Sequence, residues 1–402
     1  MNPAILHTEV QQFINKNLNA NIAKILFKGS PFKDVSAKEL VTQIISKKKC
    51  QKKLPTWFST ENIYYPEKLN IEQTSSELTA NYKSSLISGN SIIDVTGGYG
   101  VDCLYFSKKI KHVTHCELNT YLSTIVQNNY QQFKNEGVEF ISGDGIEHLK
   151  NTTKKYDWIY IDPSRRDSDK NKVFLLKDCL PNVPDNLEFL FSKTNNILIK
   201  NSPILDLKKT IEELNFVKEI HIVAVANEVK ELLFVLEKNY KENIKIKTNN
   251  IQKDKNQYFD FQLLKNNSSN YEFPKKYLYE PNTAILKSGG FHEISHQFNL
   301  EKLHPHSHLY TSENLITFPG RTFEIESTCS YNAKEIKKNL KENKANITTR
   351  NFPESVAQIR KKTKIKDGGS QYLFFTTLKN ENLKVLICSQ VFNNNSKKKN
   401  QA

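Results

Sequence analysis

The sequence predicts an α/β fold with a mostly parallel sheet, flanked by smaller regions on both sides. The first observation is that short apolar runs alternate with helix-compatible stretches of about ten to fifteen residues through the middle of the chain. Strands connected in this way lie parallel and are joined by right-handed crossovers. The second observation is that successive strands lead into acidic residues, which places these acids in the ligand-binding crevice of such a sheet.

The expected elements follow the apolar pattern along the chain. Helices are expected at 101–110, 119–133 and 205–216. Only residues 227–230 separate the last two strands, which predicts a hairpin and therefore an antiparallel edge strand. Seven strands are expected, at 91–94, 112–116, 138–142, 156–161, 196–200, 219–226 and 231–237.

The turn after the first strand is the most informative stretch. It reads S-I-I-D-V-T-G-G-Y-G from Ser91 to Gly100, with Asp94 at the end of the strand. Glycines allow a sharp turn and a close approach of ligand to backbone, and a helix that begins near Gly100 directs unpaired N–H groups to the same space. A dinucleotide would require G-x-G-x-x-G, but Cys103 stands where the third glycine belongs.

The acids beside this turn favour S-adenosylmethionine as the cofactor. This molecule has no phosphate and carries an ammonium and a sulfonium, so a carboxylate at Asp94 suits it and would repel a pyrophosphate. Glu117 follows about 23 residues later, near the interval expected for an acid that binds ribose hydroxyls. Asp144, after the third strand, can accept a hydrogen bond from an adenine amine.

These residues resemble the motifs of class I S-adenosylmethionine-dependent methyltransferases. The stretch 94–100 is similar to the first motif, and Glu117 and Asp144 resemble the ribose-binding and adenine-contacting acids of the next two. Thr96 replaces the usual first glycine, as in several nucleic-acid-modifying branches. The resemblance implies a Rossmann-like, seven-stranded methyltransferase sheet whose cofactor-binding residues are Asp94, Thr96, Gly97, Gly98, Gly100, Glu117 and Asp144.

Further stretches resemble the bacterial branch of this family that carries a THUMP-like domain. They are E-Q-T-S-S-E-L-T-A at 72–80, D-P-S-R-R at 162–166, and the run 350–369. The segment 72–80 either folds over the cofactor, as the resemblance implies, or is an ordinary helix start. The implied parts are an N-terminal helical region at 1–70, the methyltransferase domain at 71–265, a ferredoxin-like module at 275–320, a THUMP-like module at 321–392 and a disordered tail at 393–402.

Composition and charge indicate several domains and a polyanionic partner. The 402 residues are 38% hydrophobic and carry a formal charge of +15, which is typical of proteins that bind nucleic acid. A low-GC genome, which enriches lysine everywhere, explains the charge equally simply. The basic cluster at 360–366 either meets phosphates or is a solvated face, and the lysines at 47–53 either contact RNA or complement the dipole of a helix that Ser36 caps.

The remaining composition predicts a cytoplasmic protein without a membrane span or a metal. Six cysteines without a C-x-x-C pair indicate reduced thiols, and no apolar run reaches roughly 18 residues. The N-terminus, with Glu9, is not typical of a signal peptide. His304, His306 and His308 could face a metal from one strand, but acidic and cysteine ligands are missing nearby, so no metal site is expected.

The D-P-S-R-R motif predicts the acceptor chemistry. Methyl transfer is an in-line displacement, so the protein mainly positions the nucleophile. Asp162, with the carbonyl beside Pro163, is the expected catalytic pair: these oxygens would accept hydrogen bonds from an exocyclic base amine and draw off its positive charge. Ser164, Arg165 and Arg166 are expected to bind substrate; alternatively, the arginines pair with nearby acids at 167 and 169.

The motif also bears on which base is modified. Amino-methyltransferases of the best-known pattern continue with a second proline and an aromatic residue that stacks on a flipped base, whereas Ser164 and Arg165 stand there. The shorter Asp-Pro resembles bacterial ribosomal RNA guanine-N2 methyltransferases. The expected function is methylation of an exocyclic base nitrogen, with guanine N2 favoured, in rRNA or tRNA. Two alternatives stay open: a protein or small-molecule methyltransferase, and a non-catalytic RNA-binding protein with a vestigial cofactor fold.

Overall fold

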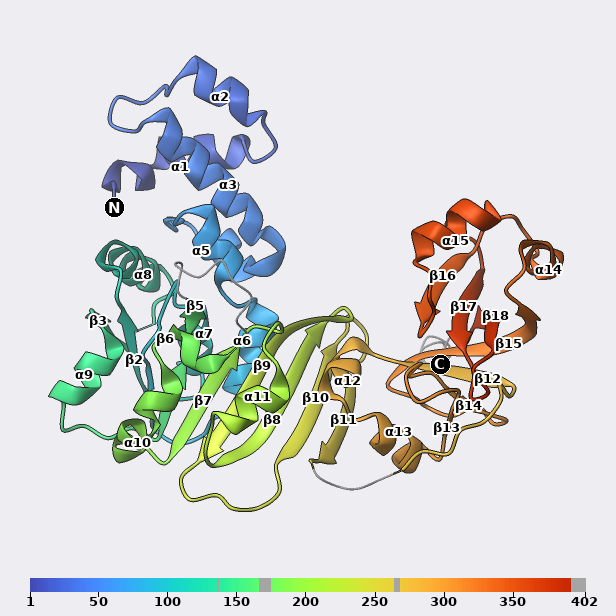
Figure 1. Cartoon of the computed structure of the whole chain (residues 1–402). Helices are drawn as coiled ribbons and strands as arrows, with labels where there is room; N and C mark the ends of the chain where they lie inside the picture. The colour runs from blue at the N-terminus through green and yellow to red at the C-terminus, as the bar shows by residue number, and fades with distance from the viewer. Residues whose placement is uncertain (136, 166–174, 264–267, 392–402) are drawn as a thin grey trace, which may run out of the picture. The chain divides into compact units, whose positions relative to one another are not determined.

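The computed structural model describes residues 1–135, 137–165, 175–263 and 268–391 (Figure 1). The chain divides into two compact units, Met1–Ile220 with Lys230–Glu242, and His221–Val229 with Asn243–Ala402. The expected disordered tail at 393–402 and the expected substrate residue Arg166 lie outside the described residues.

Short helices make up the N-terminal region. The longest, α3 (Ala37–Lys53), begins with the predicted capping box, in which Ser36 and Glu39 bond to each other's backbone N–H groups. Leu40 and Ile44 lie on its buried face. The other helices are η1 (Pro3–Leu6), α1 (Thr8–Lys16), α2 (Ile22–Lys28), α4 (Pro55–Ser59) and α5 (Lys68–Gln73).

All seven predicted strands are present, in a sheet that contains nine. The strand order is β11-β10-β8-β9-β7-β4-β1-β2-β3, and β7, β4, β1, β2 and β3 pair in parallel. The strands are β1 (Ser91–Asp94), β2 (His112–Glu117), β3 (Val138–Ser142), β4 (Trp158–Ile161), β7 (Asn196–Asn201), β8 (Val217–Val225), β9 (Glu228–Glu237), β10 (Lys245–Ile251) and β11 (Gln257–Gln262).

The prediction of seven strands with an antiparallel edge was wrong in one respect. β9 pairs antiparallel to β7 as expected, but the hairpin of β10 and β11 extends the sheet, so neither β8 nor β9 is an edge. β10 reads K-I-K-T-N-N-I, a polar stretch that resembles a loop. Backbone pairing does not require apolar side chains, so composition alone does not reveal such a strand.

Helices follow the strands in the alternation that the sequence predicted. Among them, α7 contacts β2, and α8 contacts β2 and β3. The expected helix at 101–110 ends earlier than predicted, at Phe106. The helices are α6 (Glu77–Ser84), α7 (Val101–Phe106), α8 (Thr120–Gln132), α9 (Gly145–Asn151), α10 (Val183–Lys193) and α11 (Leu207–Glu212).

The C-terminal part contains a second sheet, in the order β13-β14-β12-β15-β18-β17-β16. The long strand β15 pairs with β12 on one side and with β18 on the other, so the ferredoxin-like and THUMP-like modules share one sheet. The strands are β12 (Tyr277–Pro281), β13 (Glu301–Lys302), β14 (Tyr310–Ser312), β15 (Gly320–Ser330), β16 (Asn346–Arg350), β17 (Gln371–Thr377) and β18 (Leu383–Gln390).

Four helices accompany this second sheet. Ile336 of α14 and Ile359 of α15 join one apolar cluster with residues of β17 and β18, so both helices cover the same face of the sheet. The helices are α12 (Thr283–Ser288), α13 (Phe291–Phe298), α14 (Ala333–Asn339) and α15 (Val356–Thr363).

The structure also places the cysteines and the clustered histidines. All six cysteines lie among the described residues, are buried and form no disulfide. His304 bonds Glu381 and Asn351, and the described residues hold no group of three metal-ligating side chains. Within the described ranges, no helix has both the length and the apolar character needed to span a bilayer.

Candidate active site

Thr96 connects the ends of two neighbouring strands. Its backbone N–H and its hydroxyl donate to Asp94 Oδ1 at 2.9 and 3.1 Å. The same hydroxyl accepts a hydrogen bond of 2.7 Å from the backbone N–H of Asp162, which follows β4. A glycine at position 96 would lack this hydroxyl. The threonine therefore joins the expected cofactor turn to the expected catalytic motif.

The glycines keep the turn close to neighbouring groups. The N–H of Gly98 donates to Glu117 Oε2 at 2.8 Å, and the N–H of Asn119 donates to Oε1 at 2.7 Å. A Cβ on Gly97 would lie 2.3 Å from Nε2 of His115. Gly100 has φ +75°, a left-handed conformation that favours glycine. Glu117 thus connects the glycine turn to the start of α8.

Leu118 and Asp144 follow the ends of the neighbouring strands β2 and β3. Asp144 Oδ1 caps α9 by accepting hydrogen bonds from Ile146 and Glu147, at 2.7 and 3.2 Å. Leu118 directly follows Glu117 and is 72% exposed. The sequence motifs do not single out Leu118; the available signal is an apolar residue directly after the ribose-binding acid. A large exposed apolar side chain beside two acids suits the face of a planar ring.

Asp162 has a charged partner that the sequence motifs do not indicate. Lys200 of β7 donates from Nζ to Asp162 Oδ2 at 2.5 Å. Burial alone would lower the pKa of Lys200, but the carboxylates of Asp162, Glu231 and Asp102 outweigh it and raise the pKa. Burial raises the pKa of Asp162, and Lys200 opposes this shift. Lys200 therefore stays charged and favours the carboxylate form of its partner.

The remaining motif residues lie directly after Asp162. Pro163 is buried, whereas Ser164 is exposed. Ser164 begins the short strand β5 (Ser164–Arg165), which pairs with β6 (Cys179–Leu180). The side chain of Arg165 and all of Arg166 lie outside the described part of the chain. The structure therefore places Asp162, Pro163 and Ser164 directly after β4, with Asp162 bonded to Thr96, and does not place the two arginine side chains.

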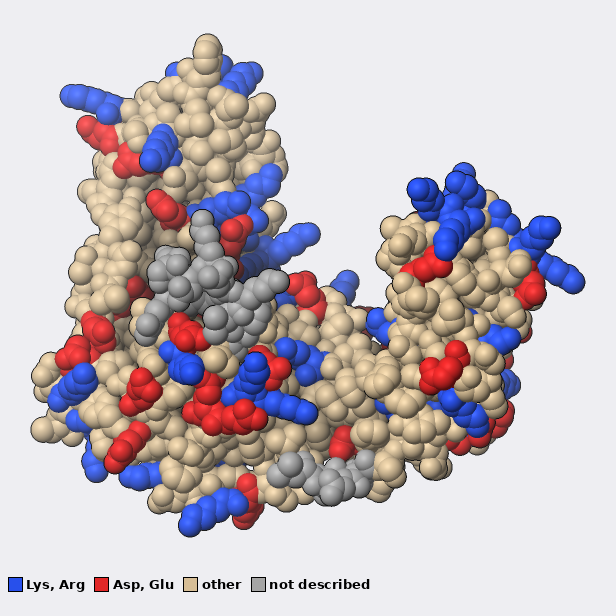
Figure 2. Space-filling model, in the orientation of Figure 1, with Lys and Arg blue, Asp and Glu red and all other residues tan. Residues whose placement is uncertain are grey.

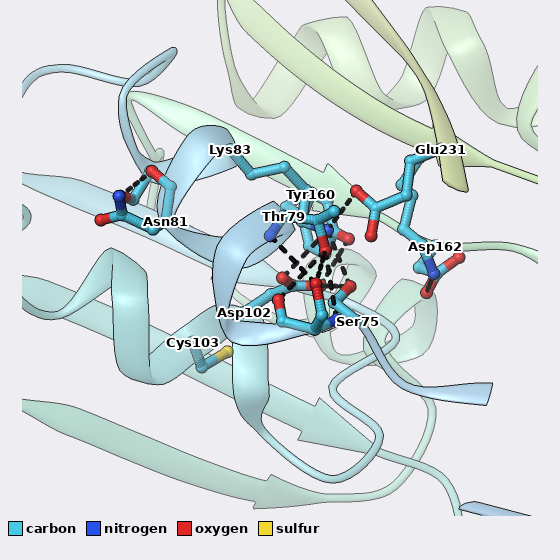
Figure 3. A network of polar contacts seen from close by, with 12 residues as sticks. Ser75, Thr79, Asn81, Lys83, Asp102, Cys103, Tyr160, Asp162 and Glu231 are labelled. Atoms are coloured by element: carbon cyan, nitrogen blue, oxygen red, sulfur yellow. Dashed lines mark hydrogen bonds and ion pairs between the residues drawn. The ribbon is translucent and has the colours of Figure 1, made fainter. Parts of the chain in front are cut away.

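A buried ion network lies beside the glycine turn (Figure 3). Lys83 of α6 is fully buried, and its Nζ contacts Asp102 Oδ1 at 3.1 Å and Glu231 Oε2 at 2.6 Å. Ser75 and Tyr160 donate to Asp102 Oδ2 at 2.9 and 2.8 Å. The network connects α6, α7, β4 and β9. Apart from Ser75 and Lys83, which are eight residues apart, its members stand far apart in the sequence.

The same network gives the position of the segment 72–80. Ser76 caps α6 in a capping box with Thr79, so this segment contains an ordinary helix start, one of the two alternatives. Ser75 accepts a hydrogen bond of 2.7 Å from Lys83 and donates to Asp102 in the helix after the glycine turn. The segment is therefore anchored to the helix that begins at the cofactor turn.

Carboxylates outnumber ammonium groups in this region. Among the described residues, Asp102, Asp162 and Glu231 form ion pairs with Lys83 and Lys200, Lys53 also attracts Glu231, and Asp94 forms no ion pair. Burial, followed by the nearby Asp102 carboxylate, raises the pKa of Asp94 to about 7. Burial also lowers the pKa of His115 to about 4, so this imidazole is neutral and adds no positive charge. A cationic ligand would offset the excess of negative charge.

Comparison with known proteins identifies relatives of each part of the chain. A family model described as conserved hypothetical protein 95 matches residues 43–219, a ferredoxin-like domain model matches 277–319, and a THUMP domain-like model matches 320–390. A Mycoplasma mobile protein named as an uncharacterised RNA methyltransferase is 28% identical over 193 residues. The match covers 45% of this chain and 52% of that protein, so the chain spans about half of its length.

One solved structure resembles the chain over nearly its whole length. The crystal structure of a protein from Porphyromonas gingivalis W83, provisionally assigned as a methyltransferase, is 32% identical in sequence and superposes with a TM-score of 0.87. The alignment covers 97% of this chain and 98% of that protein. The likeness therefore includes the N-terminal helices and the C-terminal sheet as well as the central sheet.

Replacing Lys83 with methionine is expected to lower the free energy of unfolding by about 3–5 kcal/mol, because two buried carboxylates lose their cation. Chemical denaturation measures this loss. The exposed Lys109→Met variant loses the same charge and should stay within about 0.5 kcal/mol of the parent protein. A Lys83→Met protein as stable as the parent would show that the network does not stabilise the fold.

Replacing Gly97 with alanine is expected to lower the free energy of unfolding by roughly 1–3 kcal/mol, because the new Cβ overlaps the His115 ring. The clash predicts a rescue: removing the ring in Gly97→Ala/His115→Ala should recover part of the loss. A double-mutant cycle measures the coupling between the two positions. Purely additive effects would contradict the proposed contact.

Proposed function

Because the chain belongs to the family of methyltransferases that carry a THUMP-like domain, we propose that it transfers a methyl group from S-adenosylmethionine to an exocyclic base nitrogen in structured RNA. The substrate is rRNA or tRNA, and guanine N2 is the favoured atom. The observation that carries this proposal is the Thr96 hydroxyl, which bonds both Asp94 and the backbone of Asp162. The donor and acceptor sites thus share one hydrogen-bond network.

The residues around the glycine turn fit S-adenosylmethionine. Asp94, with Thr96 and the glycines, would hold the cationic amino acid part, because this region has an excess of carboxylates. Glu117 would accept the ribose hydroxyls, Asp144 the adenine amine, and Leu118 would cover one face of the ring. When bound, the cofactor supplies a methyl group that is already activated on a sulfonium.

Asp162 would orient the base amine and stabilise its charge. Lys200 occupies Oδ2, which leaves Oδ1 to accept a hydrogen bond from the amine N–H. As the nitrogen–methyl bond formed, the sulfur–methyl bond of the cofactor would break, and the Asp162 carboxylate would stabilise the positive charge on the nitrogen and accept the proton that the nitrogen then loses. Pro163 has no N–H to compete for this oxygen. Lys200 acts through Asp162 as a positioning residue, because it holds the carboxylate's direction and opposes the rise that burial causes in its pKa.

Guanine N2 is favoured over adenine N6 by the residues after the proline. The exposed Ser164 stands near the place where an aromatic ring would stack on a flipped adenine. We propose that Arg165 and Arg166 contact a phosphate or the edge of the guanine. The target base, extruded from its stack, would enter beside Asp162.

The THUMP-like module presents a basic face for RNA. Arg360 is not a free part of it, because its guanidinium bonds Asp367 and the backbone oxygens of Ile365 and Ala345. Figure 2 shows Lys and Arg side chains gathered over α14 and α15. A polyanion such as RNA is the partner that this face suits. The exposed lysines of this face that form no ion pair with a described acid are Lys334, Lys337, Lys338, Lys361, Lys364 and Lys366.

We also propose that the enzyme acts in the cytoplasm. Six buried cysteines that form no disulfide in the described structure suit a reducing compartment, and so does an RNA substrate.

The RNA assignment predicts a difference between a deletion strain and its parent. Mass spectrometry of nucleosides from rRNA and tRNA should show one methylated nucleoside missing in the deletion strain and restored by the intact gene. Unchanged nucleosides in both RNA classes would refute the RNA substrate. Calorimetry distinguishes the enzyme from a non-catalytic RNA-binding protein. If roughly millimolar S-adenosylmethionine gives no heat of binding, the methyltransferase proposal is refuted.

The Asp162→Ala variant is expected to bind S-adenosylmethionine as the parent does and to lose about 100-fold or more in turnover, because it lacks the oxygen that orients the amine. Radiolabelled methyl transfer to RNA from the deletion strain measures turnover. Lys200→Met should lower turnover less, because the carboxylate remains. Full activity of Asp162→Ala would overturn its assigned role.

Cofactor affinity is expected to rise with pH. The pKa of Asp94 is about 7, so protonated Asp94 stabilises the fold at low pH, and this contribution is lost as the pH rises through that value. Binding of a cation favours the ionised form, so affinity should increase by about tenfold or more from about pH 5.5 to about pH 7.5. Calorimetry measures this rise, and Asp94→Asn should abolish most of it. An equal slope in the variant would assign the effect to another group.

A further inference from the structure

A polar pocket lies in the N-terminal helical region, away from the glycine turn in the sequence. It has a volume of about 390 Å³ and is bordered by α1, by α3 and by the end of α4 with the residues that follow it. A cavity of this size is at the lower end of the range for small-molecule sites. Among the residues that line it are Gln12, Asn15, Lys47, Phe58, Glu61 and Asn62.

Lys47 occupies an inward-facing position on α3. Gln43, Ser46, Lys47 and Cys50 recur at helical spacing, and all are buried. Gln43 bonds both the N–H and the C=O of Tyr65, at 2.9 and 2.7 Å, and Ser46 donates to the Pro66 carbonyl at 2.7 Å. These bonds fix this face of the helix. Lys47 is therefore held in the wall of the pocket with only 6% of its surface exposed.

The Lys47 ammonium has no ion-pair partner among the described residues. Its Nζ lies over the rings of Phe58 and Tyr65, each with its centroid 5.7 Å away. Glu61 also lines the pocket, but no ion pair joins it to Lys47. Burial lowers the pKa of Lys47, because a buried ammonium loses its hydration, and the nearby Glu61 carboxylate opposes this shift without reversing it. An anion in the pocket would offset this cost.

We propose that this pocket binds a phosphorylated nucleotide of the RNA substrate, with the phosphate on Lys47. A phosphate alone would not fill the pocket. The amides of Gln12, Asn15 and Asn62 offer both donors and acceptors, which match the edge of a nucleobase. That the nucleotide is part of an RNA rests on the proposed function, whereas the pocket and the Lys47 ammonium are independent of it. The site would hold RNA at a second point, separate from the methylated base.

Calorimetry with the cofactor site saturated by S-adenosylhomocysteine tests the pocket. The probes are adenosine and guanosine 5′-monophosphates, the corresponding nucleosides, inorganic phosphate and a single-stranded RNA of about ten nucleotides. The monophosphates and the RNA are expected to bind. In Lys47→Met their affinity should fall by about tenfold, while Glu61→Gln should keep or increase it, because a nearby negative charge is removed. Lys52→Met, an exposed change on the same helix, should stay within about twofold of the parent.

The outcomes separate the pocket from its ligand and from the methyltransferase reaction. Equal monophosphate binding in the parent and Lys47→Met, or no binding of any probe at about 10 mM, would overturn the site. If Lys47→Met weakened the binding of free monophosphates but left RNA binding unchanged, the proposal that the nucleotide belongs to RNA would be overturned. Lys47→Met should keep the parent's thermal stability and S-adenosylmethionine affinity. Failure of the parent protein to bind S-adenosylmethionine would instead refute the proposed function.

Discussion

The fully buried ammonium of Lys83 is the interaction on which the site depends. A charge that has lost its water is stable only with close counterions, and Asp102 and Glu231 supply them at 3.1 and 2.6 Å. These partners belong to the helix after the glycine turn and to β9. Burying one lysine therefore fixes α6, the start of α7 and the antiparallel strand relative to one another.

The same region combines stability with ligand recognition. Burial and the Asp102 carboxylate raise the pKa of Asp94, and Asp102, together with Asp162 and Glu231, raises the pKa of Lys200 against the effect of burial. The fold thus holds more carboxylates than ammonium groups beside the glycine turn, a state that a cationic cofactor would relieve. Thr96 then relates this turn to Asp162 through a single hydroxyl. Methyl donor and acceptor amine would meet at strand ends that are already hydrogen-bonded to each other.

In the proposed mechanism, the N-terminal helices and the two C-terminal modules bind the RNA, which is a polyanion. In the second unit, β15 pairs with strands of both modules, so the basic helices α14 and α15 stand on a continuous sheet. In the N-terminal region, Lys47 is buried instead of exposed. An exposed lysine attracts phosphate at long range and is screened by salt, whereas a buried one recognises a single group at short range.

The sequence by itself determined the order of seven strands and of the helices between them, the Ser36 cap of α3 and the acids at the strand ends. Apolar periodicity, glycines and capping residues act over a few neighbouring residues, so they can be recognised in the sequence alone. Tertiary structure alone decided that Lys200 meets Asp162 and that Lys83 meets Glu231, 148 residues away. It also decided that the polar stretch of β10 is a strand. Such contacts arise from packing between distant segments, and a lone lysine carries no local signal of its partner.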